Sequence, residues 1–330
     1  MQRRSIFPFF LATLLIASIA PVFAGDSRET CSKLYRQEKY KEAYPCVNQA
    51  ASEGNVKAHA ALGYMFQEGL GVEKNYRSAF VHYQKAAEAG DSNGEFGVGY
   101  LYDRGFFVPQ DYTKARYWYA LAAHKEHTGA QTNLGRLYTR GLGGEKDEKA
   151  GFELNLKAAT KGNAVGQFNV ALAYSHGRGI QRDYLEARKW YEKAASQGND
   201  DALLNLGILY SKGKGGRQDY EKAARLVRMA ADKNNKDAQY TLAQYYLKGR
   251  GVPQSNEKAV YWFERAAEND SALAMDALAE AYRTGEMGLR MNPIRFDYWQ
   301  KRAAESRSRT HEIDPAKWTF VDWIKYRFLD

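Results

Sequence analysis

The chain has 330 residues, 44% of them hydrophobic, and a formal net charge of +9 at pH 7. Acidic residues are interspersed with the basic ones throughout, which is typical of solvated helix surfaces and argues against binding to nucleic acid. The positive balance instead favours acidic partners, anionic lipid head groups or envelope polymers.

Residues 1–24 have the three-part pattern of a secretory signal peptide. Arg3 and Arg4 form a positive n-region, an apolar stretch runs from Ile6 to Ala20, and cleavage is expected after Ala24. The apolar stretch has about 15 residues, fewer than the ~20 that span a bilayer. We therefore predict a protein in the periplasm or secreted, with no membrane span in the mature chain. No cysteine follows the cleavage site, which excludes a lipid anchor there.

Residues 25–55 contain the only two cysteines, Cys31 and Cys46. They flank the polar sequence from Arg36 to Lys41 almost symmetrically, so an antiparallel hairpin would place them opposite each other. In an exported protein such a pair favours a structural disulfide over a metal or redox site. Closing this loop of 15 residues would stabilise the fold by about 3 kcal/mol. We predict an N-terminal capping hairpin with a disulfide, because the end of a stack needs extra support.

Residues 56–305 repeat one pattern every 36 residues, with a last step of 37. An Ala-Ala pair marks each unit and also precedes the first one. A fixed period in this range indicates stacked supersecondary units and not a single globular core. The pairs are Ala50–Ala51, Ala86–Ala87, Ala122–Ala123, Ala158–Ala159, Ala194–Ala195, Ala230–Ala231, Ala266–Ala267 and Ala303–Ala304.

Each unit begins with a short predicted helix, which we name helix A. A bulky residue beside a small one, such as Leu62–Gly63, is followed three residues later by an aromatic and then by glycine. The bulky and aromatic residues share one helix face, and the small residue lets another helix approach. The glycine ends the helix because it adopts the left-handed conformation without penalty. The glycines are Gly69, Gly105, Gly141, Gly177, Gly213, Gly249 and Gly285.

A second helix, named helix B, is predicted to start six residues after each glycine, or seven in the last unit. The residues there all belong to the set that caps helix N-termini. Helix B then runs to the Ala-Ala pair, where a neighbour must pack, and ends at Gly54, Gly90, Gly162 or Gly198. Asn234, Asp270 and Glu126 take the place of this glycine in the other units. The capping residues are Asn75, Asp111, Asp147, Asp183, Asp219, Ser255 and Asn292.

The combined pattern, Ala-x-x-x-Leu-Gly-x-x-Tyr-x-x-Gly-x-Gly-Val followed by Asp-Tyr-x-x-Ala-x-x-Trp-Tyr-x-x-Ala-Ala-x-x-Gly, resembles the Sel1-like repeat family, relatives of tetratricopeptide repeats. It covers roughly residues 30–305, with departures at Phe107, Gly151, Asn155 and Met287. The alternating caps predict an all-α solenoid of stacked antiparallel helix pairs, and the resemblance implies a right-handed α-solenoid. We predict seven such repeats over residues 56–305. The resemblance also implies an adaptor role.

Beyond residue 305 the period stops, and residues 306–330 are predicted to form a C-terminal capping helix. Asp314-Pro315 is a helix start, and apolar residues follow near one face. A second interpretation is an anchor to the envelope or a partner through Trp323, Lys325 and Tyr326. The apolar residues of the expected capping face are Trp318, Val321, Ile324 and Phe328.

The motifs that carry chemistry in other proteins are weak here. The repeated Gly-x-Gly follows helices and recurs in most units, so it forms loops and does not bind phosphate. His124 and His127 are too few for a structural metal site. We therefore expect no catalytic residue, cofactor or metal, and a protein that is not an enzyme.

The alternative function is a cell-wall hydrolase, because cysteine-rich Sel1-like relatives have been linked to β-lactamase and penicillin-binding activity. Ser-x-x-Lys occurs at Ser211–Lys214 and at Ser255–Lys258. No Ser-Asp-Asn or Lys-Thr-Gly companion is present, and we interpret both matches as chance.

The partner surface is expected on the A helices, which line the concave side of such stacks. One residue past the small position, and one before the glycine, the side chains vary between units and should face the groove. Arginines beside exposed tyrosines are typical of binding hot spots. Alternatively, the tyrosines pack between neighbouring A helices and the cations only offset helix dipoles. The predicted binding residues are Tyr64, Tyr100, Arg104, Arg136, Arg140, Lys212 and Lys248.

The sequence thus predicts an exported bacterial adaptor or scaffold in the cell envelope. It would be a monomer, without catalysis of its own, that holds an acidic protein partner in its groove.

Overall fold

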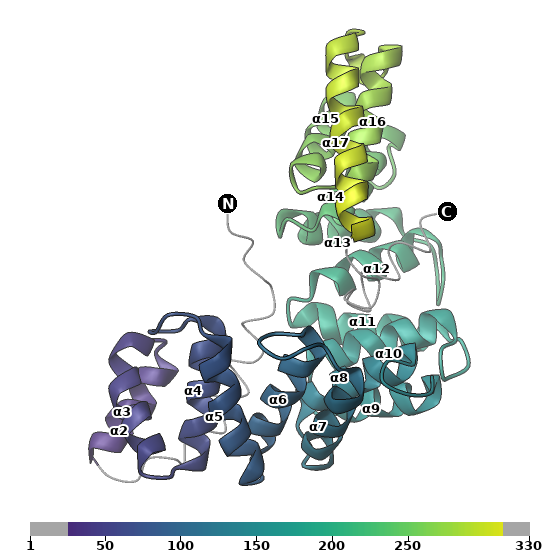
Figure 1. Ribbon diagram of the computed structural model, residues 1–330. Coiled ribbons are helices and arrows are strands. Elements are labelled where there is room, and N and C mark those ends of the chain that lie inside the picture. Colours follow the sequence, from purple (N-terminus) through teal and green to yellow (C-terminus); the bar gives the residue numbers. More distant parts are fainter. Residues whose placement is uncertain (1–25, 313–330) are drawn as a thin grey trace. The chain divides into compact units, whose positions relative to one another are not determined.

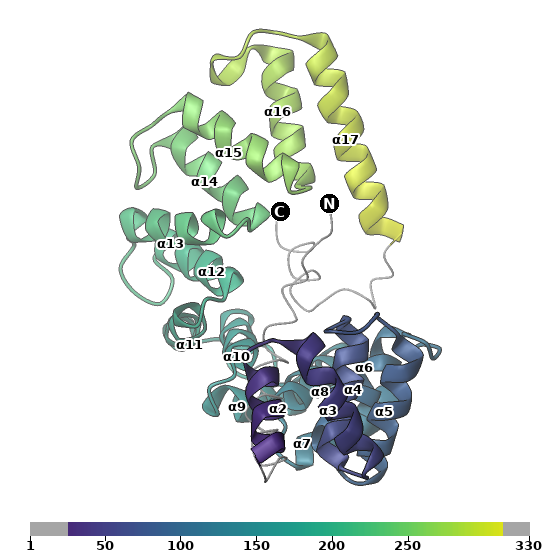
Figure 2. The same ribbon diagram turned by 90° about the vertical axis from the view of Figure 1, so that its left-hand side faces the viewer.

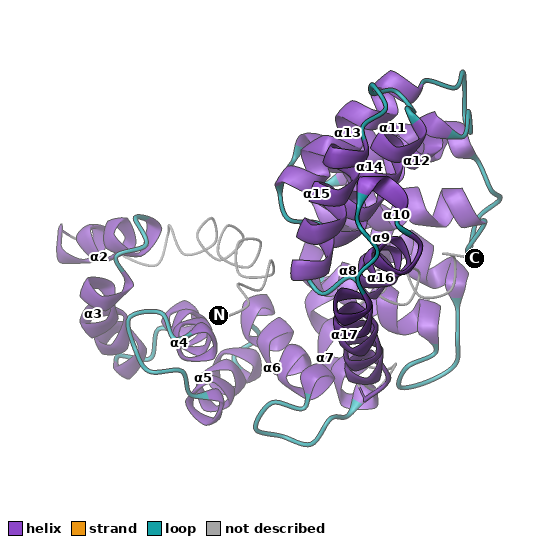
Figure 3. Ribbon diagram, turned by 90° about the horizontal axis from the view of Figure 1, so that it is seen from above, coloured by secondary structure: helices purple, strands orange, loops and turns teal. Residues whose placement is uncertain are grey.

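The computed structural model of the protein describes residues 26–312, and within that range it contains helices and loops but no strand (Figure 3). This confirms the predicted all-α stack of helix pairs (Figure 1). The hairpin is α2 (Asp26–Arg36) and α3 (Tyr40–Ser52). The A helices are α4 (Val56–Glu68), α6 (Ser92–Arg104), α8 (Thr128–Arg140), α10 (Ala164–His176), α12 (Asp200–Ser211), α14 (Lys236–Lys248) and α16 (Ala272–Thr284). The B helices are α5 (Tyr76–Glu88), α7 (Tyr112–His124), α9 (Glu148–Thr160), α11 (Tyr184–Ser196), α13 (Tyr220–Asp232), α15 (Asn256–Glu268) and α17 (Pro293–Glu312), and the 3-10 turn η2 (Glu286–Gly288) precedes α17.

The helices gather into two compact units, which divide after Lys161. In the first unit the hairpin α2–α3 packs against α4, and successive A and B helices pack against each other. In the second unit, each helix from α10 to α17 packs against the next one along the chain (Figure 2). Over residues 26–312, no helix combines the length and the apolar character needed to cross a membrane.

Two predictions fall on parts of the chain that the structure does not describe. The signal peptide predicted for residues 1–24 lies outside the described residues, and so does the helix start at Asp314-Pro315. The last B helix, α17, continues to Glu312, past the predicted end of the repeats at Glu305. No glycine follows its Ala-Ala pair to stop it, whereas glycine, Asn, Asp or Glu with a positive φ follows the others.

The predicted start of every B helix is confirmed. The side chain of each capping residue accepts a hydrogen bond from a backbone N–H three residues later, as Asp111 does from Lys114 at 2.9 Å. Pro293 is the first residue of α17, as expected. The A helices are capped in the same way, which the sequence analysis missed. Their capping residues are Asn55, Asp91, His127, Asn163, Asn199, Asn235 and Ser271.

The loop conformation persists even where glycine is absent. Glu126 and Phe107 have φ values of 65° and 66°, the left-handed region that glycine occupies at the matching positions of other units. A non-glycine residue in this region is strained by about 1–2 kcal/mol. The caps on either side therefore fix the turn more strongly than the residue in it.

Helix B contacts the next unit through one large buried side chain. Tyr83, which is 1% exposed, lies between Gly63 of its own unit and Gly97 of the next. A Cβ atom on either glycine would come within 2.5 Å of the ring. The small residues of the repeat thus make room for this ring, and Tyr119 lies against Gly99 of its own unit in a similar way.

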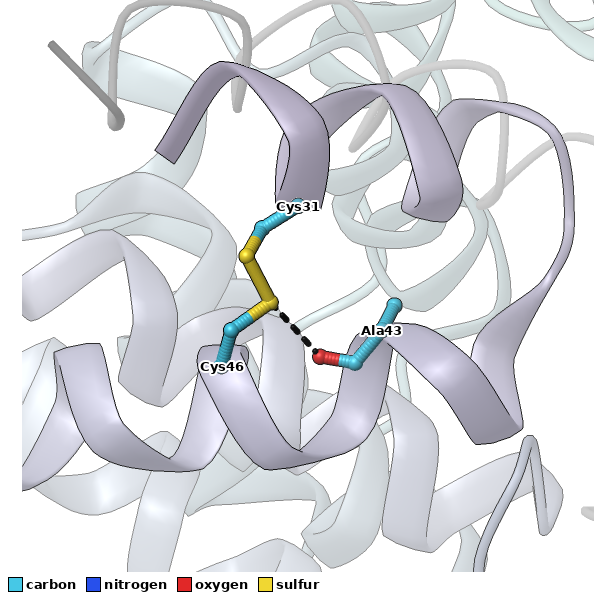
Figure 4. Close-up of a disulfide and its surroundings, with 3 residues drawn as sticks. All are labelled: Cys31, Ala43 and Cys46. Atoms are coloured by element: carbon cyan, nitrogen blue, oxygen red, sulfur yellow. Dashed lines mark hydrogen bonds between the residues drawn. A yellow bond between two sulfur atoms is a disulfide. The ribbon is translucent and has the colours of Figure 1, made fainter. Parts of the chain in front are cut away.

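The disulfide predicted between Cys31 and Cys46 is present and joins α2 to α3 (Figure 4). Cys31 is buried beside Tyr35 and Val47, which belong to the same core cluster as α4 and α5. The Cys46 sulfur lies 3.2 Å from the carbonyl oxygen of Ala43. The bridge therefore fixes the hairpin that covers the first repeat.

Candidate partner-binding surface

The predicted binding residues fall into two groups, one in each unit. Tyr64, Tyr100, Arg104, Arg136 and Arg140 lie on α4, α6 and α8 of the first unit. Lys212 and Lys248 lie at the C-terminal ends of α12 and α14 in the second unit. We describe each group by its own surroundings.

Tyr64 does not belong to an exposed surface, and this part of the prediction is wrong. Its side chain is 1% exposed and packs in the core cluster that includes Tyr35 of the hairpin. Burial raises its pKa, with smaller contributions from Glu68, Tyr40 and Glu38. The corresponding residue of α10, Leu172, is also 1% exposed and lies in a core cluster with residues of α11 and α12. For Tyr64, packing between neighbouring elements is therefore the correct interpretation.

Tyr100 and Arg104 form a partly exposed pair on α6. The Arg104 guanidinium lies 5.5 Å from the centre of the Tyr100 ring, a cation–π contact. Phe96 and Phe106 pack near the same tyrosine, and its burial raises its pKa. Among residues 26–312 no carboxylate pairs with Arg104, and its Nε has no hydrogen-bond partner. Its charge is therefore available to an acidic group.

Arg136 has a different role from the one predicted. Its side chain is 11% exposed and forms an ion pair with Asp103, which is 3% exposed. The Tyr119 hydroxyl donates to the same carboxylate at 3.2 Å, and Asn133 donates to that hydroxyl at 3.1 Å. Asp103 thus neutralises the charge of Arg136, and the pair holds α6, α7 and α8 together.

Arg140, Lys212 and Lys248 all stand at the end of an A helix. Arg140 is half-buried at the last residue of α8, while both lysines are exposed. Cations in a last turn interact favourably with the helix dipole, as the alternative interpretation proposed. Exposure leaves the two lysines accessible to a partner as well.

The serines of the two Ser-x-x-Lys matches have structural roles. Ser211 donates to the Ile208 carbonyl at 2.9 Å, whereas Lys214 donates to the Tyr184 hydroxyl, so the two do not form a nucleophile and base. Ser255 caps α15, accepting from the backbone N–H of Lys258 at 3.2 Å. Both Ser-x-x-Lys matches therefore serve the local fold.

His127 caps the N-terminus of α8. Its Nδ1 accepts a hydrogen bond from the Ala130 N–H at 3.0 Å, and its ring stacks on Phe96. Burial lowers its pKa to about 4, so it caps as the neutral imidazole. In residues 26–312 no group of three potential ligands stands close enough to hold a metal.

Two features of the structure escaped the sequence analysis. His59 and His82 approach within 2.9 Å through their Nδ1 atoms, and burial followed by His59 lowers the pKa of His82 to about 4. In the second unit, an open cavity of about 900 Å³ is lined by cations from α11, α13 and the adjoining loop. In the sequence, this cavity is indicated by Arg188 together with the Gly-Gly pair at residues 215–216, in the loop before α13.

Comparison with known proteins identifies the repeats. The chain matches the Sel1 repeat in six consecutive segments, residues 56–91, 92–127, 128–163, 164–199, 200–235 and 236–271, each of which is one A helix and one B helix. The comparison with curated proteins gave no match.

Solved structures agree. A Sel1 repeat protein from Oxalobacter formigenes is 31% identical, covers 74% of this chain and 96% of its own, and has a TM-score of 0.69. A protective antigen of uropathogenic Escherichia coli strains with an SLR fold is also 31% identical, with 79% of this chain covered and a TM-score of 0.61. The chain spans 64% of that antigen's structure. By its repeats and by these relatives, the chain belongs to the Sel1 repeat family.

Proposed function

We propose that this protein is an exported, non-catalytic adaptor of the bacterial cell envelope, which binds an acidic protein partner on its A helices. Sel1 repeat proteins are typically scaffolds for protein interactions. The disulfide between Cys31 and Cys46 is consistent with an oxidising compartment outside the cytoplasm. The signal peptide expected over residues 1–24 would take the chain there.

The main support for the partner site is the environment of Arg104. Its guanidinium lies against the Tyr100 ring on α6 without a carboxylate partner among the described residues. Arginine and tyrosine are the side chains that dominate binding energies at protein interfaces. We include Arg140 on the neighbouring α8, and Lys212 and Lys248 as the corresponding exposed cations of the second unit.

The organisation proposed for the adaptor follows the helix pairs. The hairpin of residues 25–55 caps the N-terminal end, and the pair α16–α17, which follows the last matched segment, is a seventh and divergent repeat. Residues 306–330 would cap the other end. With both ends of the stack covered, the protein acts as a monomer.

The experiment is a pull-down from envelope extract with the double charge reversal Arg104→Glu/Arg140→Glu. A matched control, Arg77→Glu/Lys149→Glu, places the same charge change on exposed positions of B helices α5 and α9 in the same unit. We expect the A-helix variant to lose the partner and the control to retain it. Unchanged capture by Arg104→Glu/Arg140→Glu would reject this surface.

A further inference from the structure

A second basic site lies within the second unit. We name it the Arg188 pocket. It is an open cavity of about 900 Å³ bordered by α11, α12, α13 and the loops that precede α13 and α15. Its lining includes Arg188, Tyr210, Arg217, Tyr220, Lys222 and Arg225.

The deepest cation of the pocket is unusually placed. Arg188 is 8% exposed, and its guanidinium stacks 4.1 Å from the centre of the Tyr210 ring. Its Nη2 donates to the carbonyl oxygens of Leu209 at 3.2 Å, Arg217 at 3.4 Å and Gly216 at 3.5 Å. Neither Nε nor Nη1 has a hydrogen-bond partner, and no carboxylate pairs with Arg188 among residues 26–312. Buried charges are normally paired, so a counter-charge is missing.

The other repeats show what this position otherwise contains. The residue at this point of helix B and the loop residue 28 positions later are both apolar in several units: Phe80 with Val108, Phe152 with Ile180, and Ala224 with Val252. Two units replace the apolar pair by arginine and glycine: Arg116 with Gly144, and Arg188 with Gly216.

The glycine is required by the arginine. A Cβ atom on Gly216 would lie 2.9 Å from Nη1 of Arg188, and one on Gly144 would approach Arg116 even more closely. The two residues therefore change together because the guanidinium occupies the space of a side chain. Exchanging an apolar contact for an unpaired buried charge breaks a packing rule without an evident gain in stability. Such positions are where functional sites are expected.

The rim of the pocket adds positive charge. Arg217 and Arg225 are exposed, and Arg217 has no ion pair among the described residues. Lys222 lies 4.1 Å from the centre of the Tyr210 ring and 3.8 Å from Glu192. The acidic lining residues are Asp219, whose carboxylate caps α13, and Glu221, which lies 3.9 Å from Arg225. Four cations thus face two carboxylates.

We propose that the Arg188 pocket binds an aspartate or glutamate side chain of an acidic peptide segment in a partner protein. The carboxylate accepts a hydrogen bond from Nη1 of Arg188 and supplies the missing counter-charge. Arg217 and Arg225 contact the acidic residues on either side of it. The cavity is too large for one small anion, and the carboxylates of Asp219 and Glu221 disfavour a continuous polyanion such as nucleic acid. The proposal does not depend on the A-helix surface.

The test is fluorescence anisotropy of the full chain with a labelled, N-acetylated hexaglutamate peptide, with hexaglutamine as the uncharged comparison. Arg188→Met keeps the length of the side chain against Tyr210 and removes the charge. Arg217→Gln/Arg225→Gln changes only exposed residues and leaves the fold intact. The matched control is Arg77→Gln/Lys149→Gln, which removes two positive charges at exposed positions of the B helices α5 and α9 in the other unit.

We expect hexaglutamate binding that weakens with salt and is absent for hexaglutamine. Arg188→Met should weaken it by about tenfold or more, the effect of one charge-assisted hydrogen bond. The rim variant should weaken it about threefold to tenfold, and the control variant on α5 and α9 should bind as the unmodified protein does.

Three results would overturn the proposal. The first is no binding of hexaglutamate. The second is that the rim variant binds hexaglutamate as tightly as the unmodified protein, whether or not Arg188→Met folds. The third is displacement of the peptide by inorganic phosphate at a similar concentration. The last result would indicate a simple anion site. Failure of the A-helix surface in the pull-down would leave all of these outcomes unaffected, so the two proposals are tested separately.

Discussion

Replacing Gly97 by alanine tests how neighbouring repeats pack. An ideal Cβ atom at this position would lie 2.4 Å from Cδ1 of Tyr83, whereas ordinary contacts are 3.4–4 Å. The ring would have to move by about 1 Å. It cannot retreat, because Gly63 lies on its other side with a corresponding distance of 2.5 Å. Tyr83 is also held by its hydroxyl, which donates to Gln67 at 3.1 Å.

Two opposing effects determine how much Gly97→Ala changes the free energy of unfolding. Overpacking a rigid core destabilises by about 1–3 kcal/mol, and the close packing of the ring against Gly63 places this site near the upper end. Alanine in a helix interior is more favourable than glycine by about 1 kcal/mol. We therefore expect Gly97→Ala to lower the free energy of unfolding by about 2 kcal/mol.

The assay is urea-induced unfolding followed by circular dichroism, with the midpoints compared at constant slope. The matched background is Tyr83→Val, because Val227 occupies this position in another unit, where Thr241 takes the place of Gly97. There the added methyl has room, and Gly97→Ala should be neutral or stabilising, a coupling of about 2–3 kcal/mol. If Gly97→Ala is as stable as the unmodified protein when Tyr83 is present, the packing described here is wrong.

Three further changes have defined outcomes. Cys31→Ser/Cys46→Ser should lower local stability of the hairpin by about 3 kcal/mol, seen as faster hydrogen exchange in α2 and α3 only; unchanged protection there would contradict a stabilising bridge. Asp103→Asn leaves Arg136 buried without its counter-charge and should cost about 3 kcal/mol in urea unfolding, whereas Glu280→Gln in the exposed pair with Arg283 should leave the unfolding midpoint nearly unchanged; equal effects would refute the assignment. For His127, the pKa in the folded protein is about 4 and lies below the unfolded value near 6.5. As the pH falls, the unfolded chain therefore takes up the proton first. The free energy of unfolding should fall by up to about 3 kcal/mol between pH 6.5 and pH 4. His127→Asn keeps a capping side chain and should remove that part of the pH dependence; identical pH profiles would show that His127 does not contribute it.

Much of the fold could be predicted because its signals are local. A helix cap acts within three residues, and the glycine that ends a helix acts within one turn, so Asp111 and Gly105 mark their helices without knowledge of the rest. The caps of the A helices were missed although they carry the same signal. His127 was among them, and a histidine cap is easily mistaken for a ligand.

The surface could be predicted only in part, because it depends on contacts between units. Tyr64 is buried in the core cluster that contains Tyr35 and Val47 of the hairpin, whereas Tyr100 at the same repeat position is partly exposed. The pairing of Arg136 with Asp103 joins residues 33 positions apart, and no pattern within one unit indicates it. Arg188 and Gly216 could have been found by comparing the units position by position, since they depart from the apolar pair together.

The central claim, a partner on the A helices, is tested most directly by site-specific photo-crosslinking in cells. A photoreactive phenylalanine replaces Tyr100 of α6 in one strain and Tyr117 of α7, which is 59% exposed, in another. We predict a crosslinked partner from position 100 and none from position 117. A partner captured only from position 117, or equally from both, would contradict the account.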